Sequence, residues 1–235
     1  MPYDLRLRTP FNMMISGPSQ SGKTTFLYQL LKASRELFME PPERIVLFYA
    51  INQPIYERMK HEGVIHELYD IAKVKLNFDD VKNKMSSYSR GAGSVIIFDD
   101  VMSFMNDIPR FDSFFTVLGH HIKCSLIFIV QNFYYKNPVF RTISINFKLL
   151  VLKKNPRDSS QIGPIAYQVC PGDTGFVKFA YHDATKNPYG YLVIDCSNDI
   201  DDNLRLRSNI FIDNDVMFPD NPYKIYLKDK MISIF

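Results

Sequence analysis

The most constraining stretch of the sequence is a loop bounded by glycines at residues 17–25. It reads Gly-Pro-Ser-Gln-Ser-Gly-Lys-Thr-Thr and matches the phosphate-binding pattern G-x-x-x-x-G-K-[ST]. Such a loop holds a triphosphate by pointing several backbone N–H groups at one anion, which requires glycine where a Cβ would clash or where φ is positive. A helix must begin where the loop ends, so that its unpaired N–H groups and its dipole face the phosphates.

The residue types in this loop indicate a site for a nucleoside triphosphate and Mg²⁺. Lys23 is placed to reach the β- and γ-phosphates, and the Thr24 hydroxyl to join the shell of the metal. A chance match is the alternative, but an apolar run over residues 11–16 suits a buried strand, and helical spacing of apolar residues follows the loop. The residues expected to bind ATP are Gly17, Pro18, Ser19, Gln20, Ser21, Gly22, Lys23, Thr24 and Thr25.

The composition restricts the class of protein. With 28 basic and 25 acidic residues, the net charge of +3 is too balanced to indicate nucleic-acid binding, so a DNA-binding surface has to be a local patch. The three cysteines are far apart and show no C-x-x-C spacing, which indicates neither a disulfide framework nor a zinc site. No apolar run approaches the ~18 residues of a membrane span, and we expect a soluble, intracellular protein.

Apolar runs alternate with amphipathic segments along the chain, which predicts an α/β fold with a mostly parallel central sheet flanked by helices. We expect residues 1–212 to form one P-loop ATPase domain. Residues 213–235 contain Pro219 and Pro222 and are expected to be an irregular tail, packed on that domain or extending from it. Strands are expected near residues 11–16, 44–50, 94–100, 126–130, 148–152, 189–196 and 204–211. Helices are expected after the loop, through residues 56–60, weakly over 64–90 and over 111–121.

Polar side chains follow two of the expected strands. Asp99 and Asp100 come directly after four apolar residues, and in P-loop enzymes one such carboxylate holds Mg²⁺ while the next polarises the attacking water. We therefore assign Asp99 to the metal and Asp100 to the water. Gln131 ends the strand over 126–130, where an amide can sense the γ-phosphate. The alternatives are a strand that ends in an Asp-rich turn, and a glutamine that caps a helix or a turn.

Several stretches together resemble the poxvirus-type genome-packaging ATPases of the FtsK/HerA clade, especially those of Polinton (Maverick) elements and related DNA viruses. The stretches are residues 17–25, 95–100, 125–132, 149–158 and 188–195, with further similarity over 49–56 and 204–209. The resemblance implies a RecA-like ASCE fold, in which an extra strand separates the P-loop strand from the acidic strand. It also implies a ring, usually hexameric, that hydrolyses ATP to drive double-stranded DNA into a preformed capsid.

The chain departs from this family at residues 119–121, which read Gly-His-His where poxvirus relatives tend to carry Gly-Arg-His. A histidine is a poor substitute for the permanent charge of a guanidinium group. Arg141 is therefore the first candidate for an arginine that acts on a neighbouring subunit, and Arg157 is the second. The alternatives are a solvated helix residue for Arg141 and a helix-start pair with Asp158 for Arg157.

Contacts with DNA are expected to be independent of sequence and to be made to phosphates. Loops over residues 102–109 and 133–138 are expected to face a ring pore, with Phe133, Tyr134 and Tyr135 as exposed aromatic residues. Each basic residue has solvated surface charge as its alternative. The basic candidates are Lys136, Lys153, Lys154, Arg205 and Arg207.

The resulting hypothesis is a viral DNA-packaging ATPase that uses ATP and Mg²⁺, with Lys23, Asp100, Gln131 and Arg141 in catalytic roles. Its partners would be double-stranded DNA, further copies of itself and the capsid or portal vertex, in the nucleus or cytoplasm of a host cell or in association with the virion. A P-loop nucleotide or small-molecule kinase is the first alternative, although no arginine-rich lid is visible. An ATP-binding assembly protein without turnover is the second, and the paired aspartates argue against it.

Overall fold

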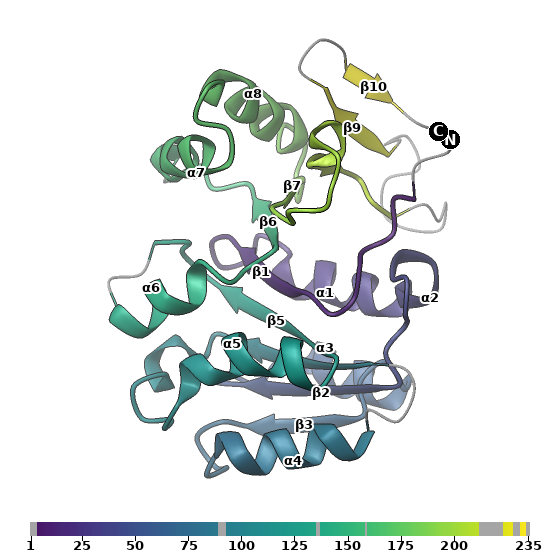
Figure 1. The fold of residues 1–235 in the computed structure, drawn as a ribbon, viewed down its shortest axis with the longest axis vertical. Helices are drawn as coiled ribbons and strands as arrows, with labels where there is room; N and C mark the ends of the chain where they lie inside the picture. The colour runs from purple at the N-terminus through teal and green to yellow at the C-terminus, as the bar shows by residue number, and fades with distance from the viewer. Residues whose placement is uncertain are drawn as a thin grey trace. The chain divides into compact units, whose positions relative to one another are not determined.

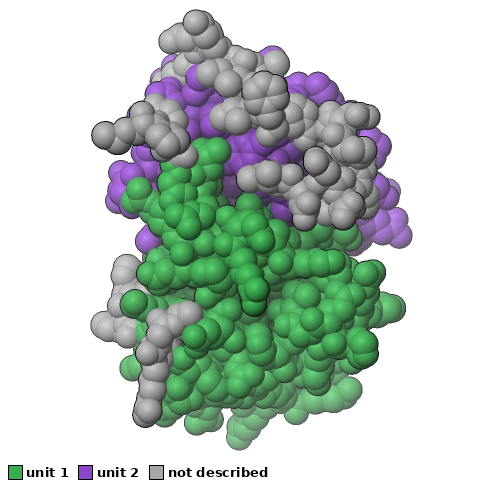
Figure 2. Space-filling model, turned by 90° about the vertical axis from the view of Figure 1, so that its right-hand side faces the viewer, with its two compact units in different colours: residues 1–14, 24–130, 135–147 green, residues 15–23, 131–134, 148–235 purple. Residues whose placement is uncertain are grey.

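The computed structural model describes residues 4–88, 93–134, 137–157, 159–211, 223–227 and 231–233, and the chain forms two compact units (Figure 2). The first unit consists of residues 1–14, 24–130 and 135–147, and the second of residues 15–23, 131–134 and 148–235. Each unit is therefore built from segments that lie far apart in the sequence. The boundary predicted at residue 212 lies outside the described residues and stays a prediction.

The first unit contains a parallel sheet in the order β1-β5-β4-β2-β3. Because β5 lies between β1 and β4, the predicted extra strand between the P-loop strand and the acidic strand is confirmed. β2, β4 and β5 are almost wholly buried apolar runs, as expected for parallel strands covered on both faces. The strands are β1 (Asn12–Ser16), β2 (Arg44–Tyr49), β3 (Glu67–Asp70), β4 (Ser94–Asp99) and β5 (Cys124–Val130).

The helices of this unit lie on the two faces of its sheet (Figure 1). α1 (Lys23–Lys32), α2 (Ser34–Leu37) and α3 (Pro54–His61) lie on one face, and α4 (Phe78–Tyr88), α5 (Phe111–His121) and α6 (Pro138–Ser144) lie on the other. Right-handed crossovers require this change of face, because the chain runs outward from β1 to β3 and then returns to β5.

The helix predicted over residues 111–121 is confirmed, whereas the prediction for residues 64–90 is partly wrong. That stretch holds the edge strand β3 before α4 begins at Phe78. β3 has only four residues and pairs along β2, so it is too short to show a periodic pattern of its own.

A cluster of phenylalanine side chains fixes the strand that carries Asp99. The ring of Phe98 on β4 lies 5.2 Å from that of Phe111 and 5.4 Å from that of Phe114, both on α5, with edge-to-face geometry. It also lies 6.5 Å from the ring of Phe128 on β5. Such pairs add about 0.5–1.5 kcal/mol each beyond the area they bury. The end of β4 is therefore anchored by the residue immediately before Asp99.

The second unit contains antiparallel strands in the order β6-β7-β8-β9-β10, with the helices α7 (Ile162–Val169) and α8 (Thr174–Ala184). The sequence did not indicate either helix, because Gly163 and Pro164 in α7 read as breakers. The strands are β6 (Leu149–Lys153), β7 (Tyr191–Asp195), β8 (Leu206–Ser208), β9 (Lys224–Tyr226) and β10 (Met231–Ser233), and short 3₁₀ turns lie at Val101–Phe104, Ser159–Gln161 and Asp202–Leu204.

Of residues 213–235, the structure describes 223–227 and 231–233, and the prediction of an irregular tail is wrong there because they contain β9 and β10. Asp183 of α8 accepts hydrogen bonds from Lys224 Nζ at 3.2 Å and from the Tyr226 hydroxyl at 2.8 Å. These strands have three residues each, so their register depends on long-range contacts that no local pattern shows. Within the described ranges, none of the helices has the length and hydropathy that crossing a lipid bilayer requires.

A buried ion pair joins β7 and β8. The guanidinium group of Arg207 lies 2.9 Å from a carboxylate oxygen of Asp195, and the two side chains are 1% and 9% exposed. The charge of Arg207 also acts on the nearby hydroxyl group of Tyr223, where it opposes the rise in pKa that burial causes. This burial excludes the predicted contact between Arg207 and DNA, so the residue acts inside the fold. Removing one partner of such a pair leaves a charge without compensation in a medium of low polarity.

We expect Arg207→Met to lower the free energy of unfolding by about 3–5 kcal/mol, because Asp195 would stay buried without its cation. Urea unfolding followed by circular dichroism measures this change. The double variant Arg207→Met/Asp195→Asn should recover part of the loss, and Arg157→Met, at an exposed position, should change stability little. An Arg207→Met variant as stable as the parent protein would contradict the assignment.

Candidate functional site

The glycine-bounded loop has the backbone geometry of an anion-binding loop. Gln20 and Gly22 have positive φ values of 65° and 81°, and the Ser21 N–H donates to the Pro18 carbonyl at 3.2 Å. Helix α1 begins at Lys23, as the pattern predicted. The ammonium group of Lys23 donates to the carbonyl oxygens of Gly17 and Pro18 at 2.7 and 3.0 Å, so the charge is held beside the loop.

Neighbouring side chains also require glycine in this loop. A Cβ atom on Gly17 would lie 2.6 Å from Cβ of Lys153 on β6, and one on Gly22 would lie 3.1 Å from a ring carbon of Tyr189. The first distance is shorter than any van der Waals contact allows, and Gly22 also has a positive φ. Both glycines are therefore fixed by close packing within the second unit as well as by the expected ligand.

Lys153 is buried beside the loop, with 4% of its surface exposed. Its Nζ atom donates to the Tyr189 carbonyl at 2.9 Å and lies 4.9 Å from the centroid of the Tyr191 ring. Burial and the nearby charge of Lys23 lower the pKa of Lys153 to about 7. The sequence placed Lys153 among the DNA contacts, and its burial shows that this prediction is wrong. A lysine that ends an apolar strand looks the same in sequence whether it is exposed or packed under a loop.

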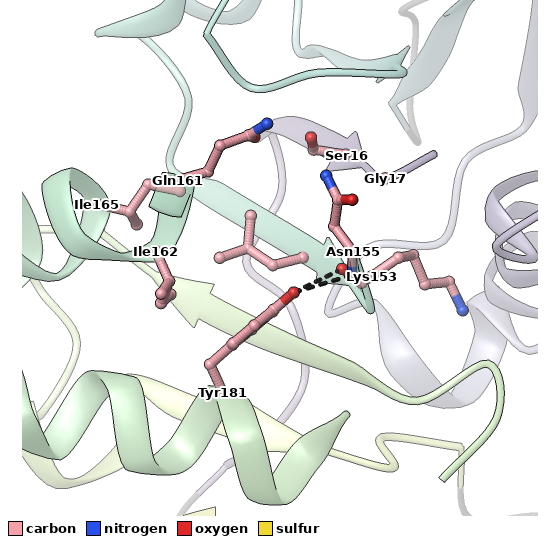
Figure 3. A pocket seen from close by; sticks show the side chains of 9 residues that line it. Ser16, Gly17, Lys153, Asn155, Gln161, Ile162, Ile165 and Tyr181 are labelled. Atoms are coloured by element: carbon pink, nitrogen blue, oxygen red, sulfur yellow. Dashed lines mark hydrogen bonds between the residues drawn. The ribbon is translucent and has the colours of Figure 1, made fainter. Parts of the chain in front are cut away.

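A small hollow lies beside the start of the loop, in the second unit (Figure 3). The Tyr181 hydroxyl donates to the Lys153 carbonyl and accepts from the Asn155 N–H, both at 3.1 Å, and these bonds fix the end of β6. The Asn155 side chain points toward Ser16 and Gly17 in Figure 3. The hollow measures about 20 Å³, enough for a water molecule but too small for a nucleotide base.

Gln131 lies directly after β5 and is exposed, as a sensor of bound phosphate has to be. The segment that follows it is anchored by Gln161, whose side-chain oxygen accepts from the Phe133 N–H at 3.3 Å. Phe133 is only 7% exposed, so the prediction of an exposed aromatic residue is wrong there, whereas Tyr134 is 39% exposed. Tyr135 lies outside the described residues, as does Lys136.

In the first unit, the two predicted metal ligands meet around one tyrosine. Asp99 is 3% exposed and Tyr56 is fully buried, and the Tyr56 hydroxyl donates to Asp99 Oδ2 at 2.5 Å. The Thr24 side chain also hydrogen-bonds to Tyr56. Burial raises the pKa of Tyr56, and the carboxylates of Asp99 and Asp100 raise it further, so the phenol keeps its proton and donates.

The sequence did not single out Tyr56 as a functional residue, although its stretch was part of the family resemblance. Pro54 occupies the first turn of α3, where its missing N–H has no helical partner to lose. This start places Tyr56 on the buried face of the helix, with its ring stacked 5.5 Å from that of Tyr49. The tyrosine therefore holds a hydroxyl ligand and a carboxylate ligand of the predicted site together.

These residues fit a magnesium ion bound together with a nucleotide. A carboxylate and a hydroxyl group supply hard oxygen ligands, and Mg²⁺ takes its remaining ligands from phosphate oxygens and water. Within the described part of the chain, no group of three or more His, Cys, Asp or Glu side chains could hold a metal ion by itself. Thr24 and Asp99 thus provide a partial shell of the kind that a metal–nucleotide complex completes.

Asp100 adopts the left-handed conformation, with φ of 58°, at the end of β4. Its N–H donates to the Ile129 carbonyl at 3.1 Å, which ties it to the end of β5. Its side chain makes no capping hydrogen bond to the following 3₁₀ turn. Asp100 is half-buried and stays the predicted base for the attacking water.

The two candidate arginines are both exposed, Arg141 in the last turn of α6 and Arg157 in the turn after β6. Their exposure fits both contact with a neighbouring subunit and simple solvation. Asp158, the alternative partner of Arg157, lies outside the described residues. Residues 119–121 form the last turn of α5, and nothing is described of their side chains. The choice between the arginines therefore stays a prediction.

The remaining basic candidates differ in their surroundings. Arg205 donates to Asp202 at 2.6 Å and to the carbonyls of Asp195 and Ser197 at 3.1 Å, so its charge is partly used in holding a turn. Lys154 is exposed, with its Nζ atom 3.1 Å from the carbonyl of Lys186. Of the predicted DNA contacts within the described residues, Lys154 and Arg205 are the ones that solvent reaches.

The loop after β4 and the segment before α6 are joined by a hydrogen bond. The Asn137 side chain caps α6 by accepting from the N–H groups of Val139 and Phe140, and it donates to Asn106 at 3.1 Å. These are parts of the two loops that the sequence assigned to a ring pore. Within the first unit, the two segments therefore lie side by side.

The chain resembles known viral packaging proteins in sequence and in fold. It is 26% identical over 137 residues to a DNA packaging protein of variola virus, an alignment that covers 54% of this chain and 48% of the relative. The chain thus spans about half the length of the curated relatives it matches. Its structure is similar to that of the DNA-packaging ATPase from Sulfolobus turreted icosahedral virus, with a TM-score of 0.51 and 16% identity over 82% of this chain and 96% of the other.

A second solved structure is the genome packaging NTPase from Sulfolobus turreted icosahedral virus 2 in complex with AMPPCP. It matches with a TM-score of 0.52 and 14% identity over 80% of this chain and 92% of the other. At such identities the likeness concerns the fold, and the predicted RecA-like P-loop α/β fold is confirmed. The sequence profile described as Poxvirus A32 protein matches residues 2–154, more than half of the chain, and the chain therefore belongs to the poxvirus A32 protein family.

Proposed function

We propose that this protein is an ATP-hydrolysing motor that packages double-stranded DNA into a preformed viral capsid. One observation carries the catalytic part of the proposal: Tyr56 holds Thr24 and Asp99 together by hydrogen bonds. Thr24 lies at the end of a loop that has anion-binding geometry. Membership of the poxvirus A32 family supports the packaging role, because a curated relative is named a DNA packaging protein.

The nucleotide would be held by consecutive residues of the phosphate-binding loop and the first turn of α1. The loop directs backbone N–H groups at the phosphates, and Lys23 exchanges its contacts with Gly17 and Pro18 for phosphate oxygens. Thr24, which we propose to share a metal ion with Asp99, follows Lys23 directly in the sequence. When bound, Mg²⁺ neutralises the charge that develops during phosphoryl transfer.

The remaining steps are assigned to residues at the strand ends and on the surface. Asp100 orients the attacking water and accepts its proton, and Gln131 senses the γ-phosphate. Arg141, or Arg157 as second candidate, completes the site of a neighbouring subunit in a ring that is expected to be hexameric. The positive charge from that neighbour stabilises the transition state and couples hydrolysis to the interface between subunits.

The substrate of the motor is DNA of any sequence, contacted through its phosphates. A hydrogen bond between Asn106 and Asn137 joins the two segments that are expected to face the pore. The motor would act in the nucleus or cytoplasm of an infected host cell, at the portal vertex of a capsid. Binding through phosphates predicts a strong dependence on salt.

Phosphate release, measured with and without double-stranded DNA, tests this proposal. We expect hydrolysis of ATP that DNA stimulates independently of sequence, in an assembly that forms with ATP and DNA. Transfer of phosphate to a small acceptor would instead indicate a kinase. Nucleotide binding without turnover would indicate an assembly protein, and a strict monomer under all conditions would contradict the ring.

We expect Asp100→Asn to reduce the turnover number by at least about 100-fold, because an amide cannot accept the proton of the attacking water. Binding of ATP, followed by fluorescence of a labelled analogue, should stay within about threefold of the parent protein, since Asp100 is not assigned to the nucleotide or the metal. Asp112→Asn, in the first turn of α5, serves as the matched control. Undiminished hydrolysis by Asp100→Asn would remove this residue from its role.

We expect Tyr56→Phe to raise the Mg²⁺ concentration needed for half-maximal activity by about 10-fold, because groups that hold metal ligands contribute about this much to affinity. The maximal rate at saturating Mg²⁺ should change less, since the phenol does not contact the reacting phosphate. A Mg²⁺ titration of ATP hydrolysis measures both quantities. Tyr28→Phe, with its hydroxyl on Glu62, removes a surface hydrogen bond and should leave the Mg²⁺ requirement unchanged.

We expect Arg141→Ala to lower hydrolysis by about 1,000-fold or more if this residue acts on a neighbouring subunit. Mixing Arg141→Ala with Lys23→Ala subunits should then restore part of the activity. In such a mixture some sites combine an intact loop with an intact arginine. Arg157→Ala is tested in the same way, and the arginine whose variant shows no complementation is not the residue that acts between subunits.

A further inference from the structure

The side chain of Lys153 runs along the phosphate-binding loop from its first glycine to its last. Its Cβ atom lies 2.6 Å from the position of a Cβ on Gly17, and its Nζ atom lies 3.8 Å from that of a Cβ on Gly22. All of these residues belong to the second unit. The Lys153 amine is therefore held next to the segment whose N–H groups are expected to face the phosphates.

The groups around this amine come from the phosphate-binding loop, from β7 and from the turn before β7, while α8 holds the backbone of Lys153. Lys23 contributes a positive charge from the loop, and β7 contributes the ring of Tyr191, 4.9 Å from Nζ. The turn before β7 contributes the Tyr189 carbonyl, at 2.9 Å, and the Tyr181 hydroxyl of α8 bonds to the Lys153 carbonyl. A carbonyl and an aromatic face both favour the ammonium form, whereas burial and the charge of Lys23 oppose it.

We propose that Lys153 is a second positive charge of the nucleotide site, which takes up a proton when the triphosphate binds. This inference rests on the proposed nucleotide binding and adds a residue and a proton to it. The pKa of Lys153, lowered to about 7 by burial and by Lys23, leaves the amine largely neutral above neutral pH. Phosphates bound to the loop bring several negative charges close to Nζ and favour the protonated form.

The sign of the pH dependence follows from this linkage. Below about pH 7 the amine is protonated with and without nucleotide, so affinity is highest and independent of this group. As the pH rises above 7, binding has to draw a proton from solution, and affinity falls by up to about 10-fold per pH unit. The affinity stops falling above the pKa that Lys153 has in the complex, because the amine is then neutral both with and without nucleotide.

Isothermal titration calorimetry with ATPγS and Mg²⁺ at pH 8 measures the proton directly, by comparing buffers of different ionisation enthalpy. We expect the parent protein to take up between about half a proton and one proton per nucleotide. Lys153→Met should abolish this uptake and weaken binding, whereas Lys154→Met, one residue later and exposed, should retain it. Lys153→Arg should bind without proton uptake, because a guanidinium group stays charged.

Two results would overturn the inference. One is nucleotide binding by the parent protein without proton uptake at pH 8. The other is the same proton uptake in Lys153→Met, which would show that Lys153 only supports the turn at Tyr189 through its hydrogen bond. If neither variant folds, the affinity of the parent protein between pH 6 and 9 decides the matter, since a flat profile contradicts the proposal. Absence of nucleotide binding at pH 6 would overturn the proposed function as well.

Discussion

The residues around the phosphate-binding loop are constrained by its narrow backbone, whose N–H groups we propose to hold a triphosphate. The loop has to be narrow, so Gly17 and Gly22 leave no room for side chains of their own. The space they leave is filled by Lys153 and Tyr189, which pack directly against them. The side chains that pack on the loop therefore come from other parts of the second unit, namely from the end of β6 and from the turn before β7.

The proposed metal ligand Asp99 is governed by the cost of burying a charged group. Asp99 is almost completely buried, and a buried carboxylate is costly unless hydrogen bonds or a cation compensate its charge. Tyr56 supplies such a bond and keeps its proton, because burial and the nearby carboxylates raise its pKa. The phenol thus holds together Asp99 and Thr24, the two residues that we propose as ligands of a magnesium ion. The phenylalanine cluster around Phe98 fixes the strand end on which this arrangement depends.

Much of the first unit was predictable because its signals are local. Four consecutive apolar residues before Asp99 indicate a buried strand, and the spacing over residues 111–121 indicates a helix that the structure confirms. The second unit was less predictable, since α7 contains Gly163 and Pro164 and since β9 and β10 are only three residues long. Such elements form because distant partners pair with them, as Asp183 does with Lys224 and Tyr226.

The sequence by itself determined the phosphate-binding loop and the paired aspartates, and these motifs carried the resemblance to the family. Each of these motifs consists of neighbouring residues in the sequence, and its residue types and their spacing are typical of one kind of chemistry. Only the tertiary structure decided which lysines are buried, which tyrosine holds Asp99 and which arginine is an internal ion-pair partner. Lys153, Tyr56 and Arg207 have no local signal for these roles, because burial and pairing depend on residues 36, 43 and 12 positions away.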